Sequence, residues 1–363
     1  MILARERGEP QPRTAVHAPP LSRGTYGSRI ATPCRRSRSP RTVGWCGVVT
    51  SHGVHWRLVG RQRGYIAAVN ANQVSNRPAV IDVHAHVHHE SVIRDREAFA
   101  SQDAWFRVQN PPGSRRLSTV SRLVAQMDAD DIDVSWALGF GWRDHGLAVD
   151  QNDLIREASR GHENRIRLFG SANPAAGLAA IREVERLASS GFSGIGELFP
   201  DGQGFDLTDR ETMAPFLEVC EATRMAIVVH ASEPVGRDYA GRDRTTPDRV
   251  LQLIDLAAEV APKVTLIFGH LGGGLPLYAH MPDVRRRIER ALVWFDTAAC
   301  RFLWDPSVLA ESSRLCPGRI LFGSDHPVGG IGAMRRWVDD ANLVPEVRGG
   351  VMGLDAPGLR VNE

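Results

Sequence analysis

From residue 78 onward, short apolar runs alternate with amphipathic stretches along the chain. The apolar runs are mostly continuous and do not switch between apolar and polar at every second position. Continuous runs are typical of parallel strands that are covered on both faces of a sheet. We therefore predict eight strands, at residues 79–84, 132–139, 165–171, 192–198, 225–230, 263–269, 293–298 and 319–324.

The amphipathic stretches between these strands have helical spacing. They predict helices at residues 118–130, 150–161, 175–190, 211–223, 247–260, 281–291, 307–315 and 331–341. Eight β/α repeats of about 34 residues each match a (β/α)₈ barrel, the TIM barrel, of roughly 250 residues. A doubly wound parallel sheet is the alternative α/β fold, but no G-x-G-x-x-G motif follows the first strand.

Residues 1–78 differ from the rest of the chain. They contain thirteen arginines and two glutamates, a net charge of +11, so the remaining 285 residues carry −9 of the overall +2. This segment is also rich in Pro, Ser and Gly, a composition that buries too little apolar surface to offset the entropy of ordering. We predict a largely disordered basic extension at 1–78, followed by one barrel domain at 79–363.

Three interpretations of the basic extension remain open. Its arginines could contact phosphate groups of a nucleic acid or a membrane surface. An organelle transit peptide is similarly rich in Arg and Ser and poor in acidic residues. The third interpretation, which we favour, is an extension without a function of its own.

The composition excludes several classes of protein. With 42% hydrophobic and 24% charged residues spread along most of its length, the chain is neither collagen-like, coiled-coil nor wholly disordered. No stretch reaches the roughly 18 apolar residues of a membrane span. The five cysteines are far apart and form no C-x-x-C pair, which favours a reducing compartment. We therefore expect a cytoplasmic protein.

Imidazole or carboxylate side chains stand at the C-terminal ends of five predicted strands, the end where the chemistry of such barrels is located. These are His84 and His86, Glu197, His230, His270, and Asp325. Residues two apart on a strand point to the same face, so the first two histidines can bind one ion. Each residue alone could be a hydrogen-bonded histidine or a cap, but coincidence at five strand ends favours a metal site.

Neutral imidazole and carboxylate groups are ligands that suit zinc, manganese or iron. None of the predicted ligands is a cysteine, which argues against a purely structural zinc site. A catalytic ion with an open position would lower the pKa of bound water to around 7. We expect one or two divalent ions, most plausibly Zn²⁺, with Mn²⁺ and Fe²⁺ as alternatives.

These strand-end segments resemble the amidohydrolase superfamily, in particular its amidohydrolase-related branch of metal-dependent TIM-barrel hydrolases and decarboxylases. The resemblance spans residues 79–360. It is carried by Ile81-Asp82-Val83-His84-Ala85-His86, Gly194-Ile195-Gly196-Glu197-Leu198, Val229-His230-Ala231-Ser232-Glu233-Pro234, Gly269-His270-Leu271-Gly272-Gly273, Trp294-Phe295-Asp296-Thr297 and Leu321-Phe322-Gly323-Ser324-Asp325-His326-Pro327.

The resemblance implies roles for individual residues. If one ion binds, its ligands would be His84, His86, His230 and Asp325, and His270 would polarise the substrate or transfer a proton. If two ions bind, His230 and His270 would hold the second and Glu197 would bridge both. A carboxylated lysine bridge is not available, because the only lysine, Lys263, begins the sixth strand. We favour one ion.

For the reaction, the main expectation is a hydrolase that acts on an amide, lactone or other ester of a small anionic molecule. Asp325 would then take a proton from metal-bound water, and Asp325 or His270 would protonate the leaving group. The alternative is a non-oxidative decarboxylase of an aromatic or unsaturated carboxylic acid, with the same ligands. A third interpretation, from another class, is a non-catalytic metal-binding scaffold or nucleic-acid-binding protein.

Four residues near the strand ends are candidates for binding the substrate. Arg237 and Tyr239 follow the fifth strand, in a loop that also holds Arg242 and Arg244, and Trp142 and Arg143 follow the second. Arginine side chains suit a substrate carboxylate, although an arginine-rich loop can also be merely solvated. We expect a small-molecule substrate as the partner, and neither a membrane nor a nucleic acid; a homodimer remains open.

Overall fold

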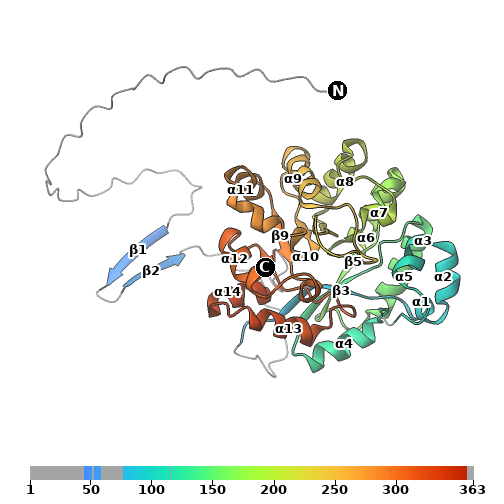
Figure 1. Ribbon diagram of the computed structural model, residues 1–363, viewed down its shortest axis with the longest axis horizontal. Coiled ribbons are helices and arrows are strands. Elements are labelled where there is room, and N and C mark those ends of the chain that lie inside the picture. Colours follow the sequence, from blue (N-terminus) through green and yellow to red (C-terminus); the bar gives the residue numbers. More distant parts are fainter. Residues whose placement is uncertain (1–44, 51–52, 59–76, 115, 358–363) are drawn as a thin grey trace, which may run out of the picture. The chain divides into compact units, whose positions relative to one another are not determined.

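The structure is a computed structural model that describes residues 45–50, 53–58, 77–114 and 116–357 (Figure 1). Contacts between Cα atoms divide the chain into two compact units, Met1–Asn72 and Gln73–Glu363. In the first unit, two strands, β1 (Trp45–Thr50) and β2 (Gly53–Leu58), pair antiparallel. The sequence analysis did not predict this pair. Apart from residues 77 and 78, the rest of the predicted disordered extension lies outside the described residues, and its boundary at residue 78 stays a prediction.

The second unit contains one parallel sheet of eight strands, in the order β10-β9-β8-β7-β6-β5-β4-β3. Each strand pairs with its neighbour along the chain, and all eight predicted strands are confirmed, with shorter ends in most cases. Their bounds are β3 (Ile81–His86), β4 (Val134–Leu138), β5 (Ile166–Gly170), β6 (Gly194–Leu198), β7 (Ala226–Val229), β8 (Leu266–Phe268), β9 (Val293–Asp296) and β10 (Ile320–Leu321).

The sheet closes on itself through the segment that follows β10. A parallel bridge joins Ala85 of β3 to His326, and the amide of Val83 donates to the carbonyl of Phe322 over 2.9 Å. The amide of Asp325 donates to the carbonyl of His84 over 2.8 Å. This closure confirms the predicted (β/α)₈ barrel and brings the end of β10 against the end of β3.

Helices surround the barrel (Figure 1). The predicted helices are confirmed as α4 (Val120–Ala129), α5 (His145–Ala158), α6 (Leu178–Ser189), α8 (Arg210–Thr223), α9 (Pro247–Val260), α11 (Pro282–Glu289), α12 (Ser307–Leu315) and α13 (Ile331–Asp340). The short elements η1 (Pro174–Ala176), α7 (Pro200–Gln203), α10 (Gly269–Gly272), η2 (Leu275–His280), η3 (Cys300–Phe302), α14 (Pro345–Gly349) and η4 (Gly350–Leu354) lie between or after them.

Three helices precede α4 that the hydrophobic pattern did not predict. They are α1 (Glu90–Arg94), α2 (Arg96–Gln102) and α3 (Ala104–Gln109). Each has at most seven residues, too few for a helical period to stand out. Local capping defines α3, because the Asp103 carboxylate accepts a hydrogen bond from the amide of Phe106 over 2.9 Å. The insertion lies between the first strand and its helix, at the end of the barrel where β3 terminates.

The buried apolar residues form two main clusters on opposite faces of the strands. Alternate strand residues such as Ile227 and Phe268 belong to a large cluster with the helices. Their neighbours Val228 and Ile267 belong to a second cluster drawn almost entirely from strands. Since successive strand residues face opposite sides, the second cluster fills the inside of the barrel, below the strand ends.

None of the helices in the described residues combines the length and the apolar character needed to cross a membrane.

The fold predicts a large difference between two helix substitutions. Phe216 of α8 is 1% exposed in the cluster between sheet and helices. We expect Phe216→Ala to lower the free energy of unfolding by about 3–5 kcal/mol, because it leaves a cavity in a packed core. Leu178→Ala, in which the native side chain is 71% exposed, should change it by no more than about 0.5 kcal/mol. Chemical denaturation of both variants measures the difference, and equal effects would contradict this packing.

Candidate metal centre

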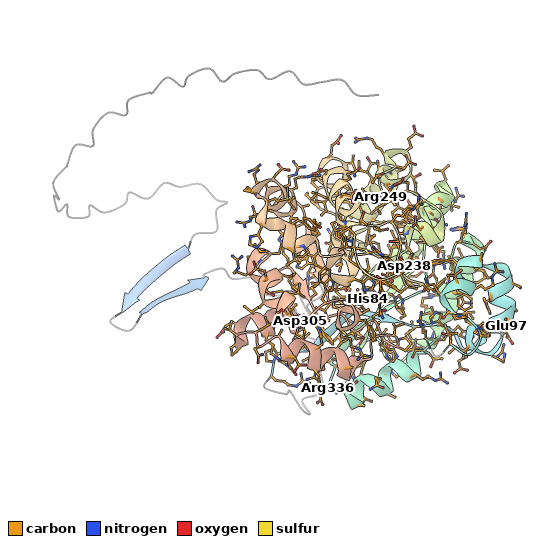
Figure 2. All side chains as sticks on the ribbon, viewed as in Figure 1. His84, Glu97, Asp238, Arg249, Asp305 and Arg336 are labelled. Carbon is orange, nitrogen blue, oxygen red and sulfur yellow. The ribbon has the colours of Figure 1, made fainter. Side chains whose placement is uncertain are left out.

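The first pair of candidate ligands lies at the C-terminal end of β3. His84 is fully buried and the His86 side chain is 16% exposed. The ring atoms His84 Nε2 and His86 Nε2 lie 3.2 Å apart, so two nitrogen lone pairs can face a common point. Figure 2 shows His84 within the barrel and charged residues such as Arg336 at its outside. The H-x-H spacing therefore brings both imidazoles together as predicted.

Asp325 joins this pair from the loop after β10. Its Oδ1 atom lies 3.5 Å from His86 Nε2 and 4.0 Å from His84 Nε2. The residue has a left-handed backbone, with φ 53°, a conformation that costs free energy outside glycine. The hydrogen bond from its amide to the His84 carbonyl holds this conformation. Such outliers gather at functional sites, where the surrounding structure over-determines them.

The second group of donors consists of two further histidines. His230 follows β7 and its Nδ1 atom lies 3.0 Å from His270 Nε2. On the other side of the His230 ring, Nε2 lies 3.2 Å from the Ser232 hydroxyl. The Phe199 ring stacks on His230 with 3.8 Å between the centroids. These contacts fix His230 so that Nδ1 faces the centre.

His270 lies in α10, directly after β8. Its backbone is left-handed, with φ 56°. Its Nδ1 atom is 2.7 Å from the carbonyl oxygen of Ala298. A carbonyl only accepts, so Nδ1 carries a proton and donates it, and Nε2 is the atom that faces the other ligands.

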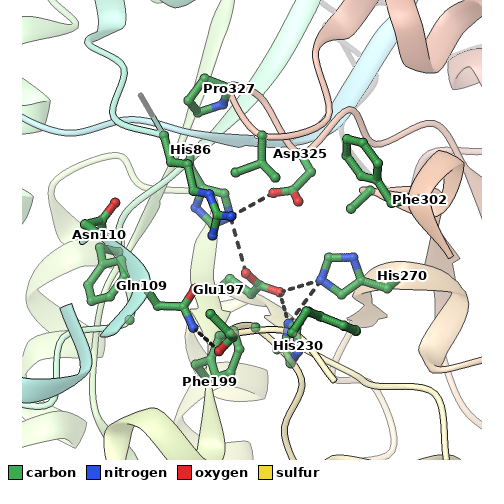
Figure 3. Close-up of a pocket in the computed structure, with 18 of the residues that line it drawn as sticks. His86, Gln109, Asn110, Glu197, Phe199, His230, His270, Phe302, Asp325 and Pro327 are labelled. Carbon is green, nitrogen blue, oxygen red and sulfur yellow. Dashed lines mark hydrogen bonds and ion pairs between the residues drawn. The ribbon is translucent and has the colours of Figure 1, made fainter. Parts of the chain in front are cut away.

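Glu197, at the end of β6, lies between the two groups (Figure 3). Its Oε2 atom is 3.3 Å from His86 Nε2 and 3.6 Å from His84 Nε2. Its Oε1 atom is 3.0 Å from His230 Nδ1 and 3.5 Å from His270 Nε2. Each carboxylate oxygen thus faces one pair of imidazoles, an arrangement that suits a carboxylate shared between neighbouring cation positions.

The six side chains form two triads of donor atoms suited to a metal ion. They are His84, His86 and Asp325, and Glu197, His230 and His270, and within each triad the donor atoms lie within 4.8 Å of one another. All six residues come from different strand ends except the H-x-H pair. Imidazole nitrogens that face one another around carboxylate oxygens match the donors that divalent Mn, Fe or Zn prefers. The residues present therefore fit a divalent metal ion.

The electrostatics of the site also favour a cation. Burial would raise the pKa of Glu197, but the charge of His84 and the hydrogen bonds from His230 and His270 lower it well below its ordinary value. Burial would lower the pKa of His270, yet the hydrogen bond and charge of Glu197 raise it to about 9. The carboxylates at this centre thus attract positive charge, which a proton or a metal ion can supply.

A cavity of about 580 Å³ opens above the donors, within the roughly 300–1,000 Å³ of small-molecule sites. Its lining includes His86, Glu197, His230, His270 and Asp325 together with the rings of Phe140, Phe199 and Phe302. Figure 3 shows Phe199, Phe302 and Pro327 around the ligand side chains. The centre is therefore the polar floor of a partly aromatic cavity.

Two of the four predicted substrate-binding residues line the cavity, and two do not. Arg237 and Tyr239 line the cavity, and the Tyr239 hydroxyl donates to Glu233 Oε2 over 2.9 Å. Trp142 and Arg143 are not part of the lining. Trp142 is 1% exposed and stacks on Phe106 with 5.0 Å between the ring centroids.

Sequence reasoning missed one charged residue of the lining, Arg116. It lies in an irregular segment before α4, and an arginine in a loop carries no periodic or motif signal. It assigned no role to Asp296, the last residue of β9, which it named only within a motif of the resemblance; Asp296 Oδ2 lies 2.8 Å from His84 Nδ1. Here a signal was present, because a carboxylate at a strand end is the same pattern that identified the other ligands.

Comparisons with known proteins agree with this architecture. The family model for amidohydrolases matches residues 81–353. None of the curated protein sequences matches the chain.

Among solved structures, 5-carboxyvanillate decarboxylase from Sphingomonas paucimobilis has 19% identity and a TM-score of 0.62, over 76% of this chain and 97% of that one. The same enzyme from Novosphingobium aromaticivorans, with bound manganese, has 20% identity and a TM-score of 0.61, over 77% and 95%. The 2,6-dihydroxybenzoate decarboxylase from Rhizobium has 19% identity and a TM-score of 0.56, over 77% of this chain and 97% of that one. At these identities the likeness establishes the shared fold.

These neighbours correct the main functional expectation from the sequence. We expected a hydrolase of amides, lactones or esters first, and this ranking was wrong, because these three similar structures are named as decarboxylases. The physical reason for the error is that both reactions use the same strand-end ligands. Ligand motifs alone therefore could not separate them.

The centre predicts which histidine controls metal binding. We expect His84→Ala to weaken binding of a divalent ion by more than the roughly 10–100-fold that loss of an outer partner costs. His280→Ala is the matched control, because that ring is 61% exposed and pairs with Glu311, away from both triads. Competition with a metal chelator measures both affinities. Wild-type affinity in the His84 variant would contradict the assignment.

Proposed function

Since the chain belongs to the amidohydrolase family, we propose that it is a metal-dependent, non-oxidative decarboxylase of a small aromatic carboxylic acid. The observation that carries this proposal is that His270 Nε2 faces the same cavity floor as the ligand atoms of the first triad. A proton donor for carbon and an anchor for the carboxylate are the two functions that decarboxylation requires. The fold shared with decarboxylases supports the same reaction.

In this proposal, the first triad holds the metal ion. His84, His86 and Asp325 would hold a divalent ion, with Glu197 and His230 beside them. When bound, this ion would supply the positive charge that anchors the carboxylate and a neighbouring hydroxyl oxygen of the substrate. We propose Mn²⁺ for this chain because the ligands suit it and a similar structure contains manganese. Zn²⁺, which the sequence analysis favoured, fits the same donors.

His270 would act as the general acid. The carbonyl of Ala298 holds its Nδ1 proton, so Nε2 is free to deliver a proton to the ring carbon that bears the carboxylate. The bond from that carbon to the carboxylate carbon then breaks, its electron pair restores the aromatic ring, and CO₂ leaves. Solvent returns the proton to Nε2. Asp325 is the alternative acid at this cavity.

The cavity walls favour an aromatic substrate that carries a further negative charge. Phe140, Phe199 and Phe302 offer faces and edges for a ring. Among the described residues, neither Arg116 nor Arg237 forms an ion pair, whereas Arg242 and Arg244 of the same loop pair with Asp238 and Asp201. The two unpaired guanidinium groups are therefore available to an anionic group of the substrate.

A carboxylate panel tests the reaction directly. We expect the manganese-loaded enzyme to release CO₂ from at least one hydroxylated aromatic acid, and His270→Gln to lower kcat by roughly 10²–10⁴-fold because the acid is lost. Metal binding should survive in that variant. Hydrolysis of an ester or lactone panel without CO₂ release, or full activity of His270→Gln, would contradict the proposal.

Arg237 and Arg244 should differ in their contribution to substrate binding, because within the described part of the chain only Arg244 is held in an ion pair. Removing the charge in Arg237→Met should raise KM by about tenfold, the equivalent of a charged hydrogen bond of about 1.4 kcal/mol. Arg244→Met is the matched control, because Arg244 already pairs with Asp201 on the outside of the same loop. Steady-state kinetics with the best substrate of the panel gives both values, and equal changes would remove the assigned anion subsite.

Metal content distinguishes one ion from two. We propose one ion, because a second would occupy His270 Nε2 and remove the acid. Elemental analysis of the wild type and His270→Ala should therefore give the same ratio of about one ion per chain. A ratio of two that falls to one in the variant would show that Glu197, His230 and His270 hold a second ion.

A further inference from the structure

Asp296 lies behind the metal centre and takes no part in the proposed reaction. It is the last residue of β9, is fully buried, and forms three hydrogen bonds. Its Oδ2 atom is 2.8 Å from His84 Nδ1. Its Oδ1 atom accepts from the amide of Ala298 over 2.8 Å and from the amide of His270 over 3.3 Å. One carboxylate therefore contacts a ligand histidine and the backbone of the proposed acid.

We infer that Asp296 is a positioning residue that selects the metal-binding tautomer of His84 and holds the His270 turn in place. This inference rests on the metal centre of the proposed function. A carboxylate has acceptor atoms only, so the proton of the neutral His84 ring resides on Nδ1. Nε2 then presents its lone pair to His86, Glu197 and Asp325 at the centre.

The second contact acts on the acid through the main chain. His270 and Leu271 both have left-handed backbones, with φ 56° for each, which costs free energy in residues that have a Cβ. The bond from the His270 amide to Asp296 stabilises the start of this turn. The Ala298 amide binds the same oxygen, and the Ala298 carbonyl binds the His270 ring. Asp296 thus links the ring position of His270 to the end of β9.

The carboxylate is closely packed as well as buried. Gly323 lies against the pair, and a Cβ atom built there would come 2.8 Å from His84 Cβ and 3.2 Å from Asp296 Cβ. The absence of a side chain at Gly323 is what lets β10 and its following loop approach so closely. A side chain at residue 323 would therefore displace His84 or Asp296 from the observed contact.

Replacing the Asp296 carboxylate by the amide of asparagine would change the tautomer of His84 while keeping nearly the same side-chain shape. If its oxygen kept the two backbone amides, its NH₂ group would face His84 Nδ1 and require a lone pair there, which moves the ring proton to Nε2. If the amide were turned over, NH₂ would face two backbone donors and leave them unsatisfied. Neither orientation reproduces the contacts of the carboxylate.

The test uses Zn²⁺ as a diamagnetic probe with the full-length protein. In the zinc-loaded wild type, long-range ¹H–¹⁵N spectra of histidine-labelled protein should show His84 protonated at Nδ1, with Nε2 bound to metal. Asp296→Asn should bind Zn²⁺ roughly 10–100-fold more weakly by chelator competition, and its metal-free spectrum should show the His84 proton at Nε2.

Asp103→Asn is the matched control. Asp103 is also a buried carboxylate, 2% exposed, and accepts from the amides of Phe106 and Arg143 without contact to a histidine. It should lose stability but keep wild-type affinity for Zn²⁺ and the wild-type His84 spectrum. A general effect of removing a buried charge would instead weaken both variants equally, which would overturn the inference.

The outcomes separate this inference from the proposed function. If the wild type fails to bind Zn²⁺ or Mn²⁺, the proposed metal centre itself fails. If the wild type binds and Asp296→Asn binds equally well with an Nδ1 proton on His84, only the role of Asp296 is overturned. Should Asp296→Asn not fold, the zinc-loaded wild type still decides, because a proton on Nε2 of His84, with Nδ1 bound to the metal, would refute the tautomer.

Discussion

The rest of the site depends on the contacts between the Glu197 carboxylate and the four histidines. Its two oxygens face two separate pairs of imidazoles, at 3.0 to 3.6 Å. Four electron-rich rings and a second carboxylate would not be stable so close together in a buried position unless positive charge lay between them. The barrel therefore concentrates donors around a place for a cation. The apolar packing beneath them, from the strand residues inside the barrel, keeps those donors from moving apart.

The positions of the donors follow from backbone geometry as much as from residue type. Asp325 and His270 both have left-handed backbones, and both are held by bonds to a neighbouring strand end. Because β3 is bonded to the segment after β10, the ends of the chain's first and last barrel strands are adjacent. The closure that completes the barrel thus also completes the first triad. Stability of the fold and assembly of the site are consequences of the same hydrogen bonds.

Much of this was available from the sequence, for physical reasons. Continuous apolar runs identified all eight strands, and a strand's direction placed His84, Glu197 and Asp325 at one end of the barrel. Two kinds of feature were not available. Short helices such as α3 depend on a single cap at Asp103, and Arg116 reaches the cavity from an irregular segment. The first is too short to show a helical period, and the second carries no motif, so neither could be read from the hydrophobic pattern.

The same limit explains why the reaction was harder to identify than the ligands. Hydrolysis and decarboxylation differ in where the proton goes, to a leaving heteroatom or to carbon, and not in what holds the ion. In the proposed decarboxylation, the proton would reach carbon from one ring nitrogen, His270 Nε2, which faces the cavity. The direction is set by the Ala298 carbonyl at Nδ1 and by the left-handed turn after β8. In the proposed decarboxylase, main-chain atoms would therefore orient the acid, while the ligand side chains would hold the metal ion.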